Sequence, residues 1–337
     1  MDTSSVSIRK QRRDLLLGAS AAACASLLPN FTRAAAFTVV AEGLQAPEAP
    51  KPQTDGSILV CEMARGTLSR VTKGNIEVIA ELGGAPNGVA IGPDGAAYVC
   101  NNGGFKFARQ GALIMPSGPL DKPGIASLQR VDLRTGQHRD LYLKLGDQPL
   151  RAPNDLVFDH SGGFWFTDPG AVVAGQAQSG SINWAKADGS QIKFVCGLPQ
   201  VNGIALSANG KTLFVATTRS PQIHAFTIVA PGELLKDAKG TAISRIHAHG
   251  MDNTGFDSLA LDSQGYLAVG TLNFADTGTG CITVIAPDGR SERVDFPEKF
   301  VTSIGFGGKD RRTAFITLTT SGKLVSMEWP RAGLALN

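Results

Sequence analysis

Six side chains with oxygen ligands recur at the same position of a repeated sequence pattern. Each repeat reads as a short apolar strand, a polar turn rich in Gly, Asp and Asn, and a second apolar strand. The second positions of the six repeats hold Glu48, Asn87, Asn154, Asn202, Asp257 and Thr302. Two carboxylates and several amide oxygens, with no Cys or His, match the oxygen preference of hard cations such as Ca²⁺. The pattern predicts a bound divalent cation.

These side chains can meet only if the repeats are arranged around an axis. Equivalent positions converge in a closed radial array, where they face one another across a central channel. The alternative is a local role, because Asn, Asp and Thr often cap backbone groups where a strand begins. An oxygen ligand at all six positions favours the shared site over six separate caps.

Further strands follow the repeated hairpins and give four strands per repeat. They are predicted at 67–71 and 76–81 after the first hairpin and at 127–132 and 138–143 after the second. Four antiparallel strands make one propeller blade. The sixth repeat supplies only a third strand, 323–328, while residues 37–42 precede the first repeat without a blade of their own. We therefore expect an all-β, six-bladed β-propeller whose last blade is closed by the N-terminal strand of the mature chain.

The second repeat carries an insertion at residues 103–124. A loop this long in a compact domain is usually functional or disordered, and its Phe105, Phe107, Leu113 and Met115 argue against disorder. It follows the second strand of its repeat, so we expect a lid or substrate wall over the channel mouth. A loop merely packed on the rim is the alternative.

Composition favours one closed domain and a small-molecule partner. The 337 residues include 40 glycines and 18 prolines, with few helical periodicities. The formal charge of +3 comes entirely from residues before Phe37, so the rest of the chain is neutral and gives no reason to expect nucleic acid or an anionic membrane. No Gly-x-Ser-x-Gly elbow and no P-loop is present, which leaves serine hydrolase and nucleotide-binding functions without support. No pattern indicates the oligomeric state.

Residues 1–36 are predicted to be a cleaved export signal that precedes the domain at 37–337. Arg12 and Arg13 are followed by an apolar run to Leu28 and by small residues at 34–36. The paired arginines are typical of the twin-arginine route, which exports folded proteins. The run is shorter than the roughly 20 residues of a membrane-spanning helix, which favours cleavage over an anchor. We expect a periplasmic or secreted protein.

Four cysteines remain beyond this segment, an even number that suits an oxidising compartment. Cys61 and Cys100 end the second strands of neighbouring repeats. A bridge between them and two buried free thiols are both compatible with these positions.

Four segments together indicate a known family: LRAPNDLVFDHSGGFWFTDPG, VNGIALSANGKTLFVATT, PEAP and FDSLALDSQGYLAVGT. They resemble the gluconolactonase, regucalcin and luciferin-regenerating family of six-bladed propellers. The resemblance implies a calcium ion at the channel top, with Zn²⁺, Mn²⁺ or Mg²⁺ as alternatives, and lactone hydrolysis as the commonest activity. It maps the family's metal ligands onto Glu48, Asn154, Asn202 and Asp257. The chain departs from the family at Ala49, where Gly is more common.

We expect Asp257 to be the catalytic residue. A cation stabilises the oxyanion that forms when a lactone is attacked, and a carboxylate beside it can act as general base on water or attack directly. Asn87, in register but outside the family's usual ligands, is expected to bind substrate hydroxyls. The resemblance gives Arg151 a substrate contact, and His249 could shuttle a proton or simply be a solvated residue.

Three functions fit this sequence. The first is a metal-dependent lactonase acting on a sugar lactone or a related small lactone. The second is a metal-dependent phosphotriesterase-type hydrolase, and the third is a non-catalytic, calcium-stabilised binding propeller. Likeness of fold cannot choose among them.

Overall fold

The computed structural model describes residues 36–122, 124–170, 172–173, 176–177 and 179–335. The predicted export signal lies outside the described residues, apart from Ala36. The described residues form strands and turns. None of them belongs to a helix that is long and apolar enough to cross a membrane.

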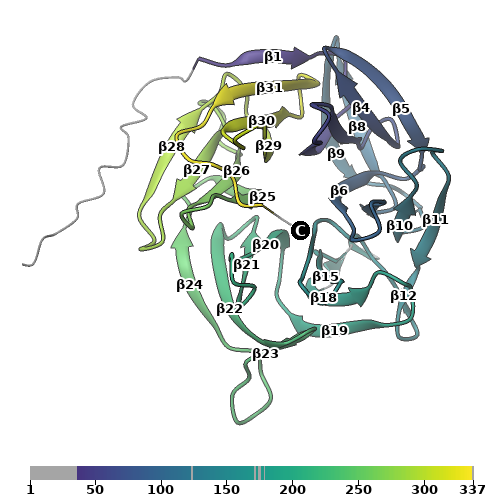
Figure 1. Ribbon diagram of the computed structural model, residues 1–337, viewed down its shortest axis with the longest axis vertical. Helices are drawn as coiled ribbons and strands as arrows, with labels where there is room; N and C mark the ends of the chain where they lie inside the picture. Colours follow the sequence, from purple (N-terminus) through teal and green to yellow (C-terminus); the bar gives the residue numbers. More distant parts are fainter. Residues whose placement is uncertain (1–35, 123, 171, 174–175, 178, 336–337) are drawn as a thin grey trace, which may run out of the picture. The chain divides into compact units, whose positions relative to one another are not determined.

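Six antiparallel sheets surround a central axis, as the sequence predicts (Figure 1). The inner strands of blades 1 to 6 are β2 (Pro47–Pro52), β6 (Pro86–Ile91), β14 (Leu156–Phe158), β20 (Val201–Leu206), β25 (Thr254–Leu261) and β29 (Val301–Gly307). The second strands are β3 (Ile58–Glu62), β7 (Ala97–Asn101), β15 (Gly163–Asp168), β21 (Thr212–Thr217), β26 (Leu267–Asn273) and β30 (Thr313–Leu318). The third strands are β4 (Thr67–Thr72), β10 (Ser127–Val131), β18 (Ser181–Lys186), β22 (Gln222–Ala230), β27 (Cys281–Ile285) and β31 (Lys323–Glu328). The outer strands are β5 (Asn75–Glu81), β11 (His138–Tyr142), β19 (Ile192–Gly197), β24 (Ser244–His249), β28 (Ser291–Asp295) and β1 (Thr38–Ala41).

The chain also forms strands that are not among the four of each blade. The insertion of blade 2 forms a hairpin, β8 (Phe105–Gln110) with β9 (Leu113–Pro119), between β7 and β10. The remaining short strands are β12 (Lys144–Leu145), β13 (Gln148–Pro149), β16 (Val172–Val173), β17 (Gln176–Ala177) and β23 (Glu233–Leu234).

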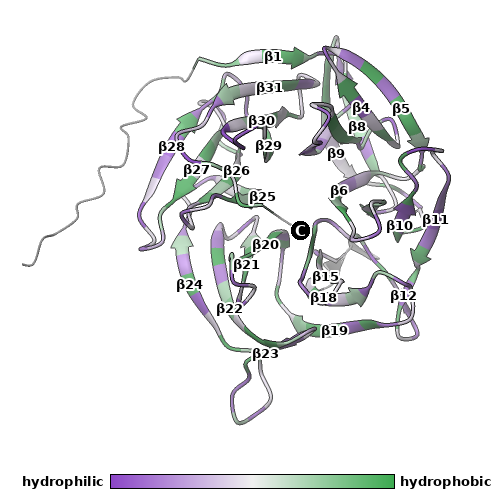
Figure 2. Cartoon of the chain, viewed as in Figure 1, coloured by the Kyte–Doolittle hydropathy of each residue, from purple (hydrophilic) through white to green (hydrophobic). Residues whose placement is uncertain are grey.

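Large apolar side chains fill the spaces between neighbouring blades. One such core joins Trp165 and Ile182 of blade 3 to Ile204, Leu213 and Phe226 of blade 4. The outer strands β5 and β24 mix hydrophilic and hydrophobic residues, and most of their side chains are exposed or half-buried (Figure 2). The cores hold each inner strand at a fixed place beside the channel.

The N-terminal strand closes the last blade, which confirms the predicted closure. β1 pairs with β31 in antiparallel register, with Thr38 opposite Ser326 and Ala41 opposite Leu324. Ala41 and Leu324 are buried in the same apolar cluster. Pairing between the two ends of the chain removes the open edge that β31 would otherwise present.

Deletion of residues 37–42 is expected to lower the melting temperature strongly and to promote aggregation. The loss exposes the edge of β31 and uncovers buried apolar side chains beneath β1. Thermal melting and light scattering of residues 37–337 and of the deletion variant measure the effect. A variant that melts like the parent would show that β1 adds nothing to closure.

The inner strands of five blades contain bulges near the predicted ligands. The pairing register shifts between Glu48 and Lys51, and likewise between Pro86 and Val89, Val201 and Ile204, Phe256 and Leu259, and Val301 and Ser303. A bulge redirects side chains out of the regular alternation of a strand. Five blades therefore carry the same local device at the position of the predicted ligands.

Candidate metal centre

The six predicted oxygen-bearing residues, here called the ring residues, lie at the start of the inner strands or just before them. They are Glu48, Asn87, Asn154, Asn202, Asp257 and Thr302. Asn202 is half-buried and the other five are buried. Polar side chains are rarely buried without a partner, since burial without hydrogen bonds is costly. Their partners therefore show what the ring can bind.

The three ring asparagines share an unusual feature. The Oδ1 atoms of Asn87, Asn154 and Asn202 are buried and have no hydrogen-bond partner. Two of the amide nitrogens donate hydrogen bonds. Asn87 Nδ2 donates to Met63 Sδ at 3.3 Å, and Asn202 Nδ2 donates to Thr218 Oγ1 at 3.1 Å. Three orphaned amide oxygens in one ring are the donor set that a hard cation would satisfy.

Glu48 is held in a defined orientation by hydroxyl groups of blade 6. Ser303 Oγ donates to Glu48 Oε2 at 2.7 Å, and Thr319 Oγ1 lies 3.5 Å from Glu48 Oε1. Thr302 Oγ1 lies 2.6 Å from Thr319 Oγ1 and supports that contact. Burial, followed by the nearby charge of Asp257, raises the pKa of Glu48 well above its usual value. A carboxylate held in this way gains from a neighbouring positive charge.

Asp257 is the second ring carboxylate, and its environment disfavours the charged form. Burial raises its pKa from 3.8 to about 7, with a hydrogen bond from Asn202 opposing the rise and the charge of Asp155 adding to it. Two buried carboxylates, of which Asp257 raises the pKa of Glu48, make a site where a cation can replace protons.

The ring fits a divalent cation on these grounds. Glu48, Asn154, Asn202 and Asp257 would hold the ion through two carboxylates and two amide oxygens. In the part of the chain that the structure describes, no group of three His, Cys, Asp or Glu side chains could hold a metal. Binding would therefore depend on the orphaned amide oxygens as well as on the carboxylates.

Asp155 belongs to the same cluster, and sequence reasoning missed it. It is buried, and burial raises its pKa from 3.8 to about 6, opposed by the N–H of Leu156 and the charge of Lys51. It also appears among the charges that raise the pKa of Glu48 and of Asp257. Asp155 follows Asn154, so regular strand alternation would turn it away from the ring. Here β14 begins only at Leu156, so that rule does not apply.

Other predicted site residues lie around the ring. Arg151 is half-buried just before Asn154, and its backbone N–H donates to Asp168 Oδ2 at 2.9 Å. Asp168 also accepts from the N–H of Ala152 at 3.0 Å. Asp168 thus orders the loop that leads into Asn154.

The structure does not bring His249 to the ring. It is exposed at the end of β24, the outer strand of blade 4, opposite Gln222. Ser244–His249 forms this outer strand by pairing with β22. A proton-shuttling role for His249 has no geometric support in the described residues.

Gly203 lets two inner strands approach closely beside the ring. A Cβ at this position would lie 2.5 Å from the carbonyl oxygen of Asp257 and 2.7 Å from Ser258 Cα. These contacts are with backbone and cannot be relieved by a rotamer change. Gly203 follows Asn202, so the spacing of two ring residues depends on its missing side chain.

Gly203→Ala is therefore expected to weaken cation binding and activity together. The added methyl group forces the backbones of β20 and β25 apart and separates Asn202 from Asp257. Calorimetric titration with calcium and rate measurements report the two effects. Gly210→Ala, at a turn of the same blade where the nearest atoms are the His160 ring, is a comparison far from the ring. Equal effects of the two substitutions would contradict the spacing argument.

The insertion folds over the ring side of the channel as a fixed wall. β7 runs antiparallel to β6 with Asn101 opposite Pro86, so the hairpin that follows lies at the end of the channel where the ring is. Ile114 N–H donates to the Thr320 carbonyl oxygen at 2.9 Å, and Arg109 donates to Gln45 Oε1 at 2.8 Å. These contacts join blade 2 to blades 1 and 6. They favour the expected wall over a loop packed only on its own blade.

A cavity of about 700 Å³ continues from the ring along the channel. All six inner strands line it, together with Leu334 and Ala335 of the C-terminal segment. The channel therefore combines the buried ring with an adjoining space.

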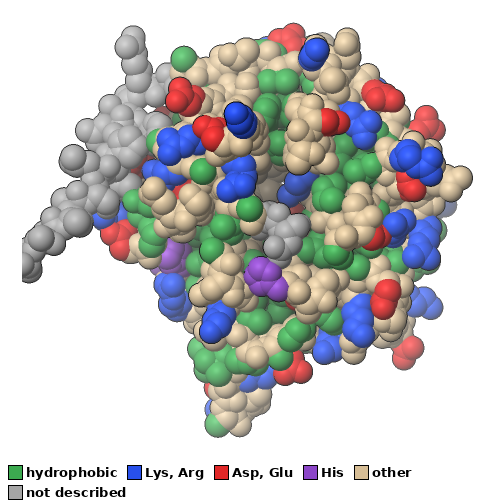
Figure 3. Space-filling model, in the orientation of Figure 1, with side chains coloured by type: hydrophobic (Ala, Val, Ile, Leu, Met, Phe, Trp, Pro, Cys, Tyr) green, Lys and Arg blue, Asp and Glu red, His purple; other side chains and the backbone are tan. Residues whose placement is uncertain are grey.

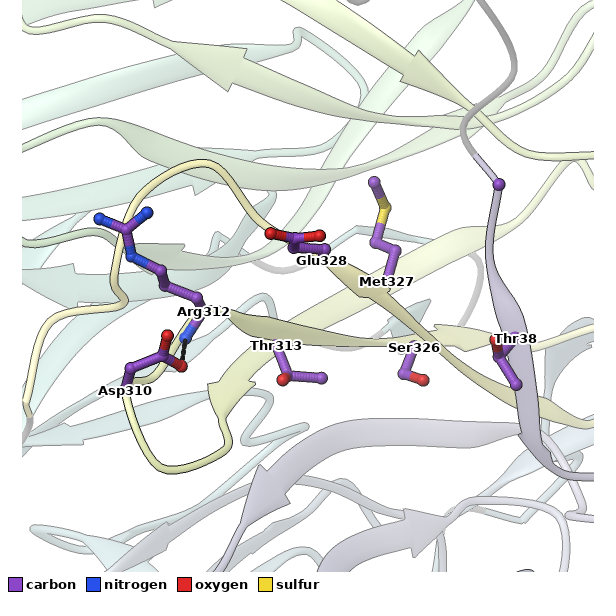
Figure 4. Close-up of a pocket in the computed structure, with 8 residues that line it drawn as sticks. Thr38, Asp310, Arg312, Thr313, Ser326, Met327 and Glu328 are labelled. Carbon is purple, nitrogen blue, oxygen red and sulfur yellow. Dashed lines mark hydrogen bonds between the residues drawn. The ribbon is translucent and has the colours of Figure 1, made fainter.

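A second cavity, of about 380 Å³, lies at the outer edge of blade 6. Thr38, Ser326 and Thr313 line it from the strands β1, β31 and β30, beside Asp310 and other polar groups (Figure 4). Arg312 N–H donates to Asp310 Oδ1 within this turn, at 3.1 Å. None of these lining residues is a ring residue, so we place the chemistry at the ring.

The cysteines show no bridge among the described residues. Cys61, Cys100 and Cys281 are buried free thiols, and Cys196 is half-buried. Burial raises the pKa of Cys61 and of Cys100 well above the usual value. Of the two possibilities for Cys61 and Cys100, the structure has the free thiols.

Comparison with known families agrees with the fold and the ring. Residues 46–320 match the model of the SMP-30/Gluconolactonase/LRE-like region. The chain belongs to this family. The matched region begins two residues before Glu48 and extends past Thr302, so all six ring residues lie within it.

Curated relatives in the family include hydrolases of two kinds. The chain is 28% identical over 211 residues to lactonase drp35 of Staphylococcus saprophyticus, covering 61% of this chain and 58% of that protein. It is 25% identical to the gluconolactonase of Zymomonas mobilis, with 60% and 52% covered. It is 26% identical to the diisopropyl-fluorophosphatase of Loligo vulgaris, with 55% and 59% covered. The matches thus span little more than half the length of these relatives.

Solved structures of the family share the fold. A gluconolactonase from Xanthomonas campestris superimposes with a TM-score of 0.67 and 20% identity, covering 87% of this chain and 89% of that one. Regucalcin from Agrobacterium tumefaciens, a calcium-binding protein, gives a TM-score of 0.66 and 18% identity, covering 89% and 95%. At these identities the likeness shows the six-bladed propeller alone.

Proposed function

We propose that this protein is a divalent-metal-dependent lactonase that opens a small hydroxylated lactone, such as a sugar lactone. The observation that carries the proposal is the set of three orphaned amide oxygens beside two buried carboxylates. Lactonase and gluconolactonase relatives support the reaction class. Calcium is the ion we propose, because the donor set is all oxygen.

The ring residues have two proposed roles, holding the ion and accepting a proton. Glu48, Asn154, Asn202 and Asp257 would hold the ion, which supplies Lewis-acid stabilisation of the developing oxyanion. Asp257 accepts the proton of the attacking water, because its carboxylate is buried in the ring beside the place proposed for the ion. The water oxygen bonds to the lactone carbonyl carbon, and the C–O bond that closes the lactone breaks. The departing alkoxide takes the proton that Asp257 accepted, which gives the hydroxy acid.

Substrate contacts come from groups next to the ring. Asn87 has an unpaired, buried Oδ1 that can accept a hydrogen bond from a substrate hydroxyl. Arg151 lies before Asn154 and is a further candidate for contact with the lactone. The β8–β9 hairpin limits access of bulk water from one side of the channel mouth.

A small molecule suits the charge distribution better than a polymer. Figure 3 shows Lys and Arg side chains interspersed with Asp and Glu side chains over the face in view, without one sign gathering into a large patch. Such mixing gives little attraction for a polyanion. The predicted export signal adds the proposal that the enzyme acts in the periplasm or outside the cell.

A panel of lactones tests the function. Purified mature protein should hydrolyse at least one lactone, lose that activity in a chelator, and regain it when calcium is added back. Calcium binding without turnover of any substrate would instead favour a binding propeller in which the ion only stabilises the blades.

A phosphotriesterase-type activity is the second candidate, because the similarity to diisopropyl-fluorophosphatase is close to that of the lactonases. A phosphotriester in the same panel decides between the two. Turnover of the phosphotriester alone would replace the lactonase proposal.

A further inference from the structure

Three basic side chains line the end of the channel that lies away from the ring, here called the far end. They are Lys51 on β2, three positions after Glu48, and Lys309 and Arg311 in the turn between β29 and β30. Lys51 is half-buried, and the other two are exposed. Among the described residues that line this cavity, Asp155 is the one acidic side chain. The cavity wall therefore carries more positive than negative charge.

Close packing of blades 1 and 6 brings these basic residues to neighbouring walls of the cavity. A Cβ on Gly307 would lie 2.4 Å from Pro52 Cβ, so only a residue without a side chain allows the strands β29 and β2 to approach in this way. Pro52 directly follows Lys51, and Gly307 lies two positions before Lys309. The two lysines thus reach the far end from strands that pack against each other.

The basic groups have no counter-ion of their own. Among the described residues, the side chains of Lys51 and Lys309 have no hydrogen-bond or ion-pair partner. Arg311 Nε donates to the Gly333 carbonyl oxygen at 2.9 Å, which fixes the guanidinium group beside the C-terminal segment without neutralising it. A half-buried ammonium group without a partner costs free energy, which a bound anion would offset.

Nearby carboxylates are already bound to other groups. Four other blades have an aspartate in the turn between their first two strands, and each of these lies outside the cavity wall and contacts another side chain. The pairs are Asp55 with Ser57, Asp94 with Arg130, Asp159 with Trp184, and Asp262 with Arg331. Asp155, which does line the cavity, accepts hydrogen bonds from the backbone N–H groups of Leu156 and Ile204. These acids leave the cations of the far end unpaired.

The turn of blade 6 separates its own charges between two cavities. Lys309 and Arg311 line the channel, whereas Asp310 and Arg312 line the outer cavity of blade 6 (Figure 4). Arg311 has a φ of 57°, in the left-handed region that is costly for a residue other than glycine. Strained backbone of this kind is concentrated at functional sites. The turn therefore presents two positive charges to the channel and keeps its acid away from it.

We propose that the far end of the channel binds a small carboxylate or phosphate anion through Lys51, Lys309 and Arg311. Ammonium and guanidinium groups form strong, charge-assisted hydrogen bonds with such anions. Gln53 and Thr54 line the same cavity and can add neutral hydrogen bonds. The cavity of about 700 Å³ has room for a small molecule. This site goes beyond the proposed lactonase function, because it requires neither the ring nor its ion.

Calorimetric titration of residues 37–337 with inorganic phosphate, and separately with malate, tests the site. The buffer is Tris chloride without chelator, because chelators and sulfonate buffers are themselves anions. Lys309→Gln and Lys51→Gln should each weaken binding about tenfold, which is the usual effect of losing one hydrogen bond to a charged group. Lys309→Glu should abolish binding, because it reverses the charge.

Lys211→Gln is the matched control for Lys309→Gln. Lys211 is an exposed lysine in the corresponding turn of blade 4 and does not line the cavity, so its loss should leave the affinity unchanged. Binding of phosphate alone would identify a phosphate site, and binding of malate alone a carboxylate site. Equal effects of the two glutamine substitutions, or no binding of either anion at millimolar concentration, would overturn the proposal.

Acetylation of the parental protein locates the anion without relying on any variant to fold. A saturating concentration of the anion that binds should slow the acetylation of Lys51 and Lys309 severalfold and leave that of Lys211 unchanged, as measured by mass spectrometry of peptides. Equal protection of all three lysines, or protection of none, would show that the anion does not bind at the far end.

Discussion

Asp257→Asn is expected to lower lactone turnover by about a hundredfold to ten-thousandfold, which is the usual contribution of a general base. The substitution keeps an oxygen atom of the same size at the ring and removes the proton acceptor. Calcium affinity should fall only modestly, because Glu48 and the orphaned amide oxygens of Asn154 and Asn202 are retained. Steady-state rates at saturating calcium report the catalytic step, and a separate calcium titration reports binding.

Asn154→Asp is the matched comparison for this prediction. It also exchanges an amide and a carboxylate at a ring position, but it adds a charge instead of removing one, so calcium binding should not weaken. If saturating calcium restores near-parental turnover to Asp257→Asn, then Asp257 is only a ligand. Because His249 lies on an outer strand, the search for the base would then move to Asp155 and Glu48.

The register of the ring could be predicted from sequence because every repeat uses the same position. The prediction did not include the means by which the side chains reach the axis. Bulges at five inner strands redirect these side chains, and the residues within them differ from blade to blade, with Asn-Gly in blades 2 and 4 but not in blades 1, 5 and 6. Ala49 shows the consequence, since its φ of 47° lies in the left-handed region that glycine adopts at lower cost.

The supporting groups of the ring could not be predicted in the same way. Ser303 and Thr319 of blade 6 hold Glu48 of blade 1, so the contact joins the two ends of the chain. Only closure by β1 and the resulting proximity of blades 1 and 6 create it. Asp155 likewise acts on the ring carboxylates Glu48 and Asp257 through the arrangement of the blades and not through any spacing in the sequence.

The insertion illustrates a different limit. Its apolar residues indicated an ordered segment, and its length indicated a functional one. Its docking depends on Gln45 of blade 1 and Thr320 of blade 6, which are distant in sequence and carry no pattern of their own. The sequence therefore predicted a wall over the channel. It did not predict which blades the wall contacts.

The ring should make the chelated protein less stable as pH rises. Asp257 and Asp155 have folded-state pKa values of about 7 and about 6 against 3.8, so between pH 4 and pH 7 the folded state binds more protons than the unfolded state. Stability that depends on those protons is present at low pH and lost as pH rises through the folded values. For Asp257 alone the difference corresponds to about 4 kcal/mol as an upper bound.

Calcium should reverse this trend, because the ion replaces the protons of the ring carboxylates. Calcium affinity is expected to fall about tenfold for each pH unit below 7 for every proton displaced, and the gain in melting temperature on adding calcium should grow from pH 5 to pH 8. Melting curves across this range, with chelator and with calcium, measure both effects. Asp257→Asn should flatten the dependence by removing one titrating group, which separates the ring from the surface carboxylates. A calcium effect that is constant with pH would mean that the ion binds away from Glu48 and Asp257, and the ring would lose its role as the metal centre.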